Sequence, residues 1–357
     1  MTLQQRIQAF DLLGKFLRQF GNSGGQRENI EELAEINAKF YDKADILIQE
    51  LKYYNPWFVE RFVRSALQAA GAMLHRKKLE KWLQYYPEMD KNAKGSRVGV
   101  IMAGNIPLVG FHDMLCVLIT GNVLIGKLSS KDEHLPEMIR ELLIAINPAF
   151  ADYIIFEKEI LKQFDAIIAT GSDNSSRYFE YYFGKYPRII RKNRNAAAVL
   201  TGDESPEALT ALTDDIFLYF GLGCRNVSKI YLPAGYDVKT LFKYFEKYTL
   251  IKDHYRYFNN YEYNKAIYLV NRTPHLDNGF VLLKEDTGIS SPVGVLFYEY
   301  YKNIDEIRKT MTGLQDRLQC VVSQDRMIPA SIPFGSTQYP EVWDYADNVD
   351  TIKFLSL

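Results

Sequence analysis

The sequence predicts an α/β protein with two α/β domains that follow a helical leader. The chain has 357 residues, more than a single hydrophobic core usually supports, so two domains are expected. In residues 3 to about 90, apolar side chains recur every three or four positions, which indicates helices. From Arg97 onward, short apolar runs alternate with segments of helical periodicity, as a parallel sheet with covering helices requires.

The leader and the first α/β stretch follow from these two periodicities. In the leader, the apolar positions are Ile7, Phe10, Leu13 and Leu17, and then Ile30, Leu33, Ile36 and Phe40. The first strand is expected at 98–102, because the run Val-Gly-Val-Ile-Met is too short for a helix and rich in β-branched residues. Further strands are expected at 123–128, 153–156, 166–169 and 196–200, and helices at 107–119 and 135–146.

A second α/β stretch is expected after Gly202, with a helix at 206–217 and strands at 229–232 and 266–270. The segment Thr-Gly-Asp-Glu-Ser at 201–205 is the expected boundary between the two stretches. The predicted division is a helical leader over 1–90 that packs on the first α/β domain, that domain over 91–202, a second α/β domain over 203–335, and a tail over 336–357.

Composition narrows the possible functions and the compartment. The 43 basic and 44 acidic residues nearly cancel and form no basic stripe, so a small molecule is a better expected partner than nucleic acid. Three cysteines without a CxxC pair favour neither a disulfide framework nor a structural zinc site. The first residues do not resemble a signal peptide, and no apolar stretch is long enough to span a bilayer. We therefore expect a cytoplasmic protein.

Several familiar motifs are excluded. The segment Gly-Asn-Val-Leu-Ile-Gly-Lys at 121–127 matches the start of a phosphate-binding loop, but its middle is typical of a buried strand. Leu128 also stands where a hydroxyl should hold magnesium. The five histidines show no metal-ligand spacing, and no Gly-x-Ser-x-Gly elbow is present, so neither a metal site nor a serine hydrolase is expected.

Cys224 is the candidate nucleophile. It follows Gly221 and Gly223 in what the sequence predicts to be a tight turn into a short helix, with Arg225 beside it. Helix-start N–H groups and a neighbouring cation both favour the reactive thiolate. Most lone cysteines are small core residues. We interpret Cys116, on the apolar side of a predicted helix, and Cys320, in the strand-like run 318–322, in that way.

Asn105 allows two interpretations. The segment Gly-Asn-Ile-Pro at 104–107 closes the first strand and is expected to open the next helix, with Pro107 at the helix start. Asn105 would then cap that helix. Alternatively, a loop beyond the carboxyl end of a parallel strand is where α/β folds bind ligands, and its amide could donate to a developing oxyanion.

The order of these motifs resembles the aldehyde dehydrogenase superfamily, and within it the fatty acyl-CoA reductase branch of LuxC type, over residues about 95 to 345. The resemblance implies an aldehyde dehydrogenase-like fold, in which the first α/β domain binds the nucleotide and the second is catalytic. It implies that Asn105 donates to the oxyanion and that Cys224 is the nucleophile. Pro333-Phe334-Gly335-Ser336 is similar to the C-terminal loop of the family.

The same resemblance implies the cofactor contacts. Lys127 would contact the adenosine ribose, while Thr170, Gly171 and Ser172 would approach the pyrophosphate. Where NAD-preferring relatives commonly carry a glutamate, this chain has Ser130, followed by Lys131. A hydroxyl and a cation suit a 2′-phosphate, so NADPH is the expected cofactor, with NADH as the other possibility. In the alternative interpretation, Ser129, Ser130 and Lys131 only turn the chain into the next helix.

Two departures from the family pattern bear on the reaction. Oxidising members carry a water-activating glutamate upstream of the cysteine, but the matching stretch here is Arg-Lys-Asn-Arg-Asn at 191–195. A thioacyl enzyme that does not recruit water can exchange with a thiol or accept hydride. The segment that usually contacts the nicotinamide ribose is also altered, over 284–292, and leaves open whether Glu285 or a neighbour makes that contact.

The expected activity is NAD(P)H-dependent reduction of an acyl-CoA thioester, with a fatty acyl group, to an aldehyde. The alternatives are reduction of an acyl phosphate, as in glutamyl phosphate reductase, and a catalytically silent relative that acts as an assembly subunit. A homo-oligomer and an enzyme that accepts the aldehyde are the expected partners. The sequence leaves acyl chain length and physiological direction open.

Overall fold

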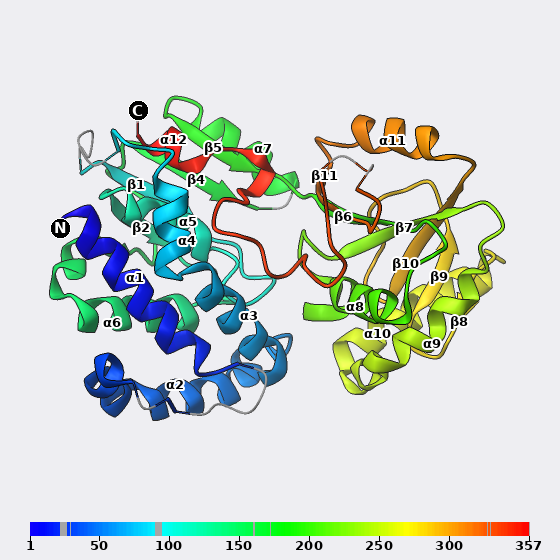
Figure 1. The fold of residues 1–357 in the computed structure, drawn as a ribbon, viewed down its shortest axis with the longest axis horizontal. Helices are drawn as coiled ribbons and strands as arrows, with labels where there is room; N and C mark the ends of the chain where they lie inside the picture. The colour runs from blue at the N-terminus through cyan, green and yellow to red at the C-terminus, as the bar shows by residue number, and fades with distance from the viewer. Residues whose placement is uncertain are drawn as a thin grey trace. The chain divides into compact units, whose positions relative to one another are not determined.

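The structure is a computed structural model and describes residues 1–21, 27–28, 30–89, 95–159, 161–171, 173–326, 328 and 330–356. The chain forms two compact units (Figure 1). Unit 1 contains Met1–Asn193 and Tyr339–Leu357, and unit 2 contains Arg194–Gln338. The chain therefore leaves unit 1 once and returns to it.

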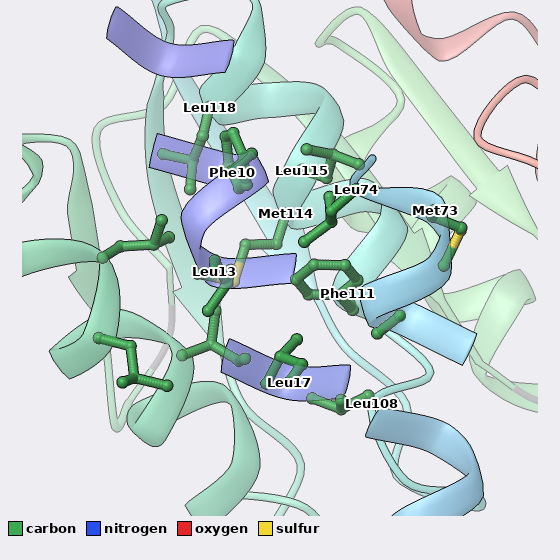
Figure 2. Packing of buried hydrophobic residues seen from close by; sticks show 14 of the residues in the cluster. Phe10, Leu13, Leu17, Met73, Leu74, Leu108, Phe111, Met114, Leu115 and Leu118 are labelled. Atoms are coloured by element: carbon green, nitrogen blue, oxygen red, sulfur yellow. The ribbon is translucent and has the colours of Figure 1, made fainter. Parts of the chain in front are cut away.

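The predicted helical leader is present in unit 1. It consists of α1 (Leu3–Arg18), the short 3₁₀ helix η1 (Glu31–Leu33), α2 (Ala34–Tyr54), α3 (Glu60–Met73) and α4 (Arg76–Leu83). Figure 2 shows Phe10, Leu13 and Leu17 of α1 in one buried cluster with side chains of α5 (Phe111–Ile119), including Leu115. These leader side chains are fully buried, so the leader belongs to the hydrophobic core of unit 1.

The sheet of unit 1 is parallel, with the order β3-β2-β1-β4-β5 among the described residues. Its strands are β1 (Arg97–Ile101), β2 (Val123–Lys127), β3 (Ile154–Phe156), β4 (Ala166–Thr170) and β5 (Arg188–Arg191). The connections contain α5, α6 (His134–Ile146), η2 (Pro148–Asp152) and α7 (Asp173–Phe183). The chain builds outward from β1 to β3 and then returns to the other side of β1 with β4. This reversal makes the carboxyl ends of β1 and β4 a topological switch point, where α/β sheets bind ligands.

Unit 2 contains a second, mostly parallel sheet, with the order β12-β11-β6-β7-β10-β9-β8 in the part of the chain that is described. Its strands are β6 (Asn195–Val199), β7 (Val227–Pro233), β8 (Leu276–Asp277), β9 (Leu282–Glu285), β10 (Val295–Tyr301), β11 (Leu318–Val322) and β12 (Ser331–Ile332). Its longer helices are α8 (Pro206–Phe217), α10 (Tyr255–Val270) and α11 (Ile304–Gly313). Between α8 and β7 lies η3 (Leu218–Gly221), and α9 (Phe242–Phe245) lies between η4 (Val238–Leu241) and η5 (Glu246–Asp253).

Apart from the Cys224 turn, which is described below, two predictions about secondary structure are wrong. Residues 266–270 are the last turn of α10 and not a strand. Their β-branched and aromatic side chains continue a helix whose buried positions, Tyr257, Tyr261, Asn264 and Tyr268, follow helical spacing. The helix predicted from Pro107 begins only at Phe111, after Gly110. The loop before it contains Leu108 with a φ of 58°, which a continuous helix does not permit.

The segment after residue 338 is fixed to unit 1. Two short helices, η6 (Ala346–Asn348) and α12 (Thr351–Leu355), form there. Arg191, at the end of β5, is buried and pairs with Asp113 of α5, with a shortest N–O distance of 2.5 Å. Nη1 of Arg191 donates to Ala346 O at 2.7 Å, and Nη2, which also pairs with Asp113, donates to Thr351 Oγ1 at 3.0 Å. The sequence-based division after residue 202 also differs from the units of the structure, because β6 pairs with β7 and β11 of unit 2.

Candidate active site

In unit 1, the Asn105 loop lies against the segment that follows β2. Gly104 makes this contact possible, because a Cβ at that position would lie 2.6 Å from Ser129 Oγ and 3.1 Å from Lys131 Cβ. Only glycine allows such an approach without a shift of the neighbouring segment. Asn105 itself is exposed. The Asn105 loop and the segment 129–131, which contains the candidate cofactor residues Ser130 and Lys131, are therefore brought together at one edge of the sheet.

Asp132 holds this pair of segments in place. Its Oδ2 accepts a hydrogen bond from the backbone N–H of Leu108 at 2.8 Å, and its side chain is only 5% exposed. Leu108 is itself buried in the leader core while its backbone is in the left-handed region, a conformation that persists only where its surroundings enforce it. From the leader, Asn55 Nδ2 donates to Lys131 O at 3.1 Å. Asp132 and Asn55 thus fix the geometry of the Asn105 loop and of the segment after β2. No pattern in the sequence indicated these contacts.

The buried Asp132 carboxyl predicts a pH-dependent stability. Burial raises its pKa to about 7, so the folded state binds a proton that the unfolded state has released. Between the ordinary and the raised pKa, the free energy of unfolding should fall by at most about 1.4 kcal/mol per pH unit as the pH rises. Asp132→Asn should remove this slope. Urea unfolding followed by tryptophan fluorescence measures it in the relevant unit, because Trp57, Trp82 and Trp343 all belong to unit 1.

Asp215 of unit 2 is also a buried carboxyl, but it is present in both the wild type and Asp132→Asn. Its contribution to the pH dependence therefore cancels when the two unfolding free energies are subtracted. Asp305→Asn is the matched control, because Asp305 is an exposed carboxylate of the other unit. A difference in unfolding free energy between wild type and Asp132→Asn that is constant from about pH 5 to about pH 8 would contradict the raised pKa.

Lys127 ends β2, as the sequence predicts, and its ammonium group donates to Lys158 O at 2.9 Å and to Glu159 O at 2.8 Å. An ammonium group has three N–H donors, and these two carbonyls use two of them. Ser129 turns the chain, since its Oγ accepts from the backbone N–H of Lys131 at 3.3 Å. Ser130 and Lys131 are exposed. The turn interpretation therefore applies to Ser129, while the two residues after it face solvent.

The candidate pyrophosphate segment follows β4, whose last residue is Thr170. At Gly171, a Cβ would lie 2.8 Å from Ser175 Cβ and 2.9 Å from Phe179 Cε2, so this glycine lets the loop pack closely on α7. Ser172 lies outside the described residues. Because α7 begins at Asp173, the loop leads directly from the switch point of the sheet into a helix N-terminus.

In unit 2, Cys224 is exposed on a turn between η3 and β7. The backbone before it is kinked, since Tyr219, Phe220 and Gly221 have φ values of 53°, 57° and 74°. The turn leads into a strand, so the short helix predicted after Cys224 is wrong, and with it the expected help of helix N–H groups to the thiolate. Arg225 stays beside Cys224, and its Nε donates to Thr337 O at 2.6 Å.

The other two cysteines have different surroundings. Cys116 is fully buried in α5, and burial raises the pKa of its thiol well above the ordinary value. Cys320 lies in β11 and is partly buried. A buried thiol is a poor source of thiolate. Exposure therefore distinguishes Cys224 from both.

The glycine loop at 333–336 is attached to α8 through Asp215, which is 1% exposed. The Asp215 carboxylate accepts from Gly335 N at 2.6 Å and from Thr337 N at 2.9 Å. Burial raises the pKa of this carboxyl to about 6. Since Arg225 also bonds to Thr337, the loop and the cysteine turn share one hydrogen-bonded neighbourhood.

The two departures from the family pattern have distinct structural surroundings. Arg191, in the stretch where oxidising relatives carry glutamate, is the buried partner of Asp113 and serves to anchor the C-terminal segment. Glu285 is exposed at the end of β9. Beside it, Lys284 and Asp286 form an ion pair at 2.5 Å. Within the described ranges, no group of three or more His, Cys, Asp and Glu side chains could hold a metal ion.

Comparison with protein families assigns the chain. The family model described as acyl-CoA reductase (LuxC) matches residues 4–239, which is more than half of the sequence. The protein belongs to the LuxC acyl-CoA reductase family. A LuxC-family member is an oxidoreductase of the general type that forms aldehydes from acyl groups. No curated protein matches the chain.

Solved structures establish the fold of this LuxC-family protein. Aldehyde dehydrogenase 21 from Physcomitrella patens, in complex with succinate, matches with a TM-score of 0.61 and 13% identity, over 91% of this chain and 74% of that one. An aldehyde dehydrogenase from Mycobacterium tuberculosis, complexed with NAD⁺, gives a TM-score of 0.59 and 13% identity over the same shares. An NADP-dependent enzyme from E. coli gives 0.61 and 10%, again over 91% and 74%. The predicted aldehyde dehydrogenase-like fold is confirmed.

Among the described residues of this LuxC-family protein, no helix combines the length and the apolar character needed to cross a bilayer.

Proposed function

We propose that this LuxC-family protein reduces an acyl-CoA thioester to an aldehyde through a thioacyl intermediate on Cys224. The observation that carries the proposal is the exposure of Cys224 on a glycine-containing turn, in contrast to the buried Cys116. An exposed thiol can reach an acyl group, whereas a thiol inside a helix core cannot. The family match supports the class of substrate.

The proposed reaction begins with attack of the Cys224 thiolate on the thioester carbonyl. The backbone N–H of Cys224 would stabilise the oxyanion that forms, and the family resemblance implies the same role for the side-chain N–H2 of Asn105. Collapse of this adduct expels the thiolate of coenzyme A and leaves the acyl group on Cys224. The stretch at 191–195 offers no carboxylate to activate water, so the thioacyl group persists until it is reduced. Cys224 then leaves as thiolate when the aldehyde is released.

A reduced nicotinamide cofactor would supply the hydride when bound. The residues at the switch point fit such a group. Gly171 brings its loop close to α7, and the helix N-terminus that follows suits a pyrophosphate. Lys127 lies at the carboxyl end of β2, and the exposed Ser130 and Lys131 follow it. We propose that these residues hold the cofactor.

NADPH is the proposed cofactor, and Ser130→Glu tests this choice. A carboxylate at this exposed position should repel a 2′-phosphate by about 1 kcal/mol in water, so the preference for NADPH should fall roughly fivefold. The measurement is the ratio of kcat/KM for the two cofactors. Ser130→Gln is the matched control, since it adds the same bulk without charge. Ser130 does not recognise the 2′-phosphate if the wild type already prefers NADH, or if the ratio of kcat/KM for the two cofactors shifts equally in both variants.

The reaction itself is tested with acyl-CoAs of graded chain length. NADPH consumption and aldehyde are measured together, and an acyl phosphate is supplied in parallel. Equimolar NADPH loss and aldehyde with acyl-CoA is the expected result. Activity only with the acyl phosphate would show that the substrate is an acyl phosphate and not an acyl-CoA. No turnover with either compound would favour a silent assembly subunit.

A further inference from the structure

A buried asparagine lies directly behind the Cys224 turn. Asn226 is 2% exposed and is the last residue before β7. Its Oδ1 accepts a hydrogen bond from Gly223 N at 2.8 Å. Its Nδ2 donates to Asp215 O at 3.1 Å, to Leu218 O at 2.9 Å and to Ile216 O at 3.4 Å. One side chain thus binds the cysteine turn on one side and the end of α8 on the other.

Asn226 also closes the turn through its backbone. Its N–H donates to Gly223 O at 3.0 Å, so Gly223 and Asn226 exchange two hydrogen bonds across the pair Cys224 and Arg225. This is the arrangement of a four-residue turn with Cys224 at its first central position. Because Asn226 takes part in both closing bonds, its placement restrains the turn that carries Cys224.

The kink before the turn needs such a restraint. Tyr219 and Phe220 occupy the left-handed region, which costs free energy for bulky residues and persists only where neighbouring contacts enforce it. The carbonyls that Asn226 binds belong to residues 215, 216 and 218, before the kink, while Gly223 comes after it. The asparagine side chain therefore ties together the two ends of the strained segment.

We propose that Asn226 is a positioning residue for the nucleophile, which holds the Cys224 turn in the orientation that attack requires. The inference rests on the proposed role of Cys224 and names the group that fixes its geometry. A reacting group displaced by about 1 Å can lose roughly 10²-fold in rate, so small movements of this turn have large consequences.

The test compares Asn226→Ala with Asn264→Ala. Asn264 is a matched control in the same unit, since it is also buried and donates to two backbone carbonyls, of Asn260 and Val293. In Asn226→Ala, we expect amide hydrogens of 222–226 to exchange about tenfold faster or more. We also expect kcat for acyl-CoA reduction to fall about tenfold or more at nearly unchanged KM. Asn264→Ala should change neither.

A second variant keeps the test decisive if Asn226→Ala does not fold. In Asn226→Asp, only the protonated carboxyl can accept from Gly223 and also donate to a carbonyl. Relative to wild type, kcat should therefore recover as the pH falls from about 8 to about 6. A role in folding alone would not produce this recovery at constant folded fraction.

The outcomes separate the two proposals, because hydrogen exchange requires no substrate. If the wild type does not reduce acyl-CoA, the proposed function is wrong. Faster exchange at 222–226 in Asn226→Ala would still show that Asn226 restrains the turn. Unchanged exchange at 222–226 would overturn the inference. Faster exchange with a wild-type kcat in an active protein would overturn it as well.

Discussion

Replacing Cys224 by alanine is expected to abolish aldehyde formation, whereas Cys116→Ala and Cys320→Ala should keep most of the activity. The reaction requires a thiolate that can reach the acyl group, and Cys224 is exposed while Cys116 is fully buried and Cys320 lies within β11. Loss of the nucleophile should reduce turnover with acyl-CoA below detection. The measurement is the rate of aldehyde formation at saturating NADPH.

The Cys116 variant is also a control for folding, since it removes a sulfur atom from the core of α5. Such a truncation costs stability, by about 1 kcal/mol, without touching the turn that carries Cys224. Thiol labelling of wild type and of each variant shows which cysteine reacts. Near-normal aldehyde formation by Cys224→Ala would refute the covalent mechanism.

Asn105→Ala should lower kcat by about 10² to 10³ while the melting temperature stays nearly constant. The sequence left two roles for this residue, an oxyanion donor and a helix cap. The structure removes the second role, because α5 begins at Phe111 with Gly110 as its N-cap, and Asn105 lies in the loop before it. The stability loss of roughly 0.5–2 kcal/mol that follows removal of a cap is therefore not expected.

Asn147→Ala, in the same unit, is a control in which stability and not activity should fall. Asn147 does cap a helix, since its Oδ1 accepts from Ala149 N at 3.1 Å at the start of η2. That variant should lose stability and keep its specific activity. If Asn105→Ala instead melts at a lower temperature and its folded fraction turns over at the wild-type rate, Asn105 is structural and the oxyanion needs another donor.

Elements that the sequence predicted well are those specified by local patterns. The short runs at 98–102 and 318–322 contain β-branched residues, and they form the mostly buried strands β1 (Arg97–Ile101) and β11 (Leu318–Val322), as runs too short for a helix are expected to do. Residues 266–270 have the same composition but end a helix. Their conformation is decided by the buried tyrosines upstream in α10, which lie beyond the run itself.

The residues missed in the candidate site are polar side chains that act on distant backbone. Asp132 binds Leu108 N, and Asp215 binds the backbone of Gly335 and Thr337. Spacing cannot reveal such contacts, because the partners lie far apart in the chain. One signal was present for Asp215, which follows Leu209 and Leu212 at helical spacing on the apolar side of α8. A carboxylate on a buried face requires a partner.

The return of the chain to unit 1 has a consequence for folding during synthesis. Unit 2 is one continuous segment, Arg194–Gln338, whereas the buried Arg191 of unit 1 needs Ala346 and Thr351 to complete its hydrogen bonds. Domains generally fold as units while the ribosome elongates the chain. All of unit 2 is made before residues 339–357, so unit 2 can finish folding first. Most of unit 1 is made before unit 2, but the Arg191 guanidinium lacks two of its hydrogen-bond acceptors until residues 346 and 351 emerge. Unit 1 therefore completes its buried polar contacts last, although most of its residues are made first.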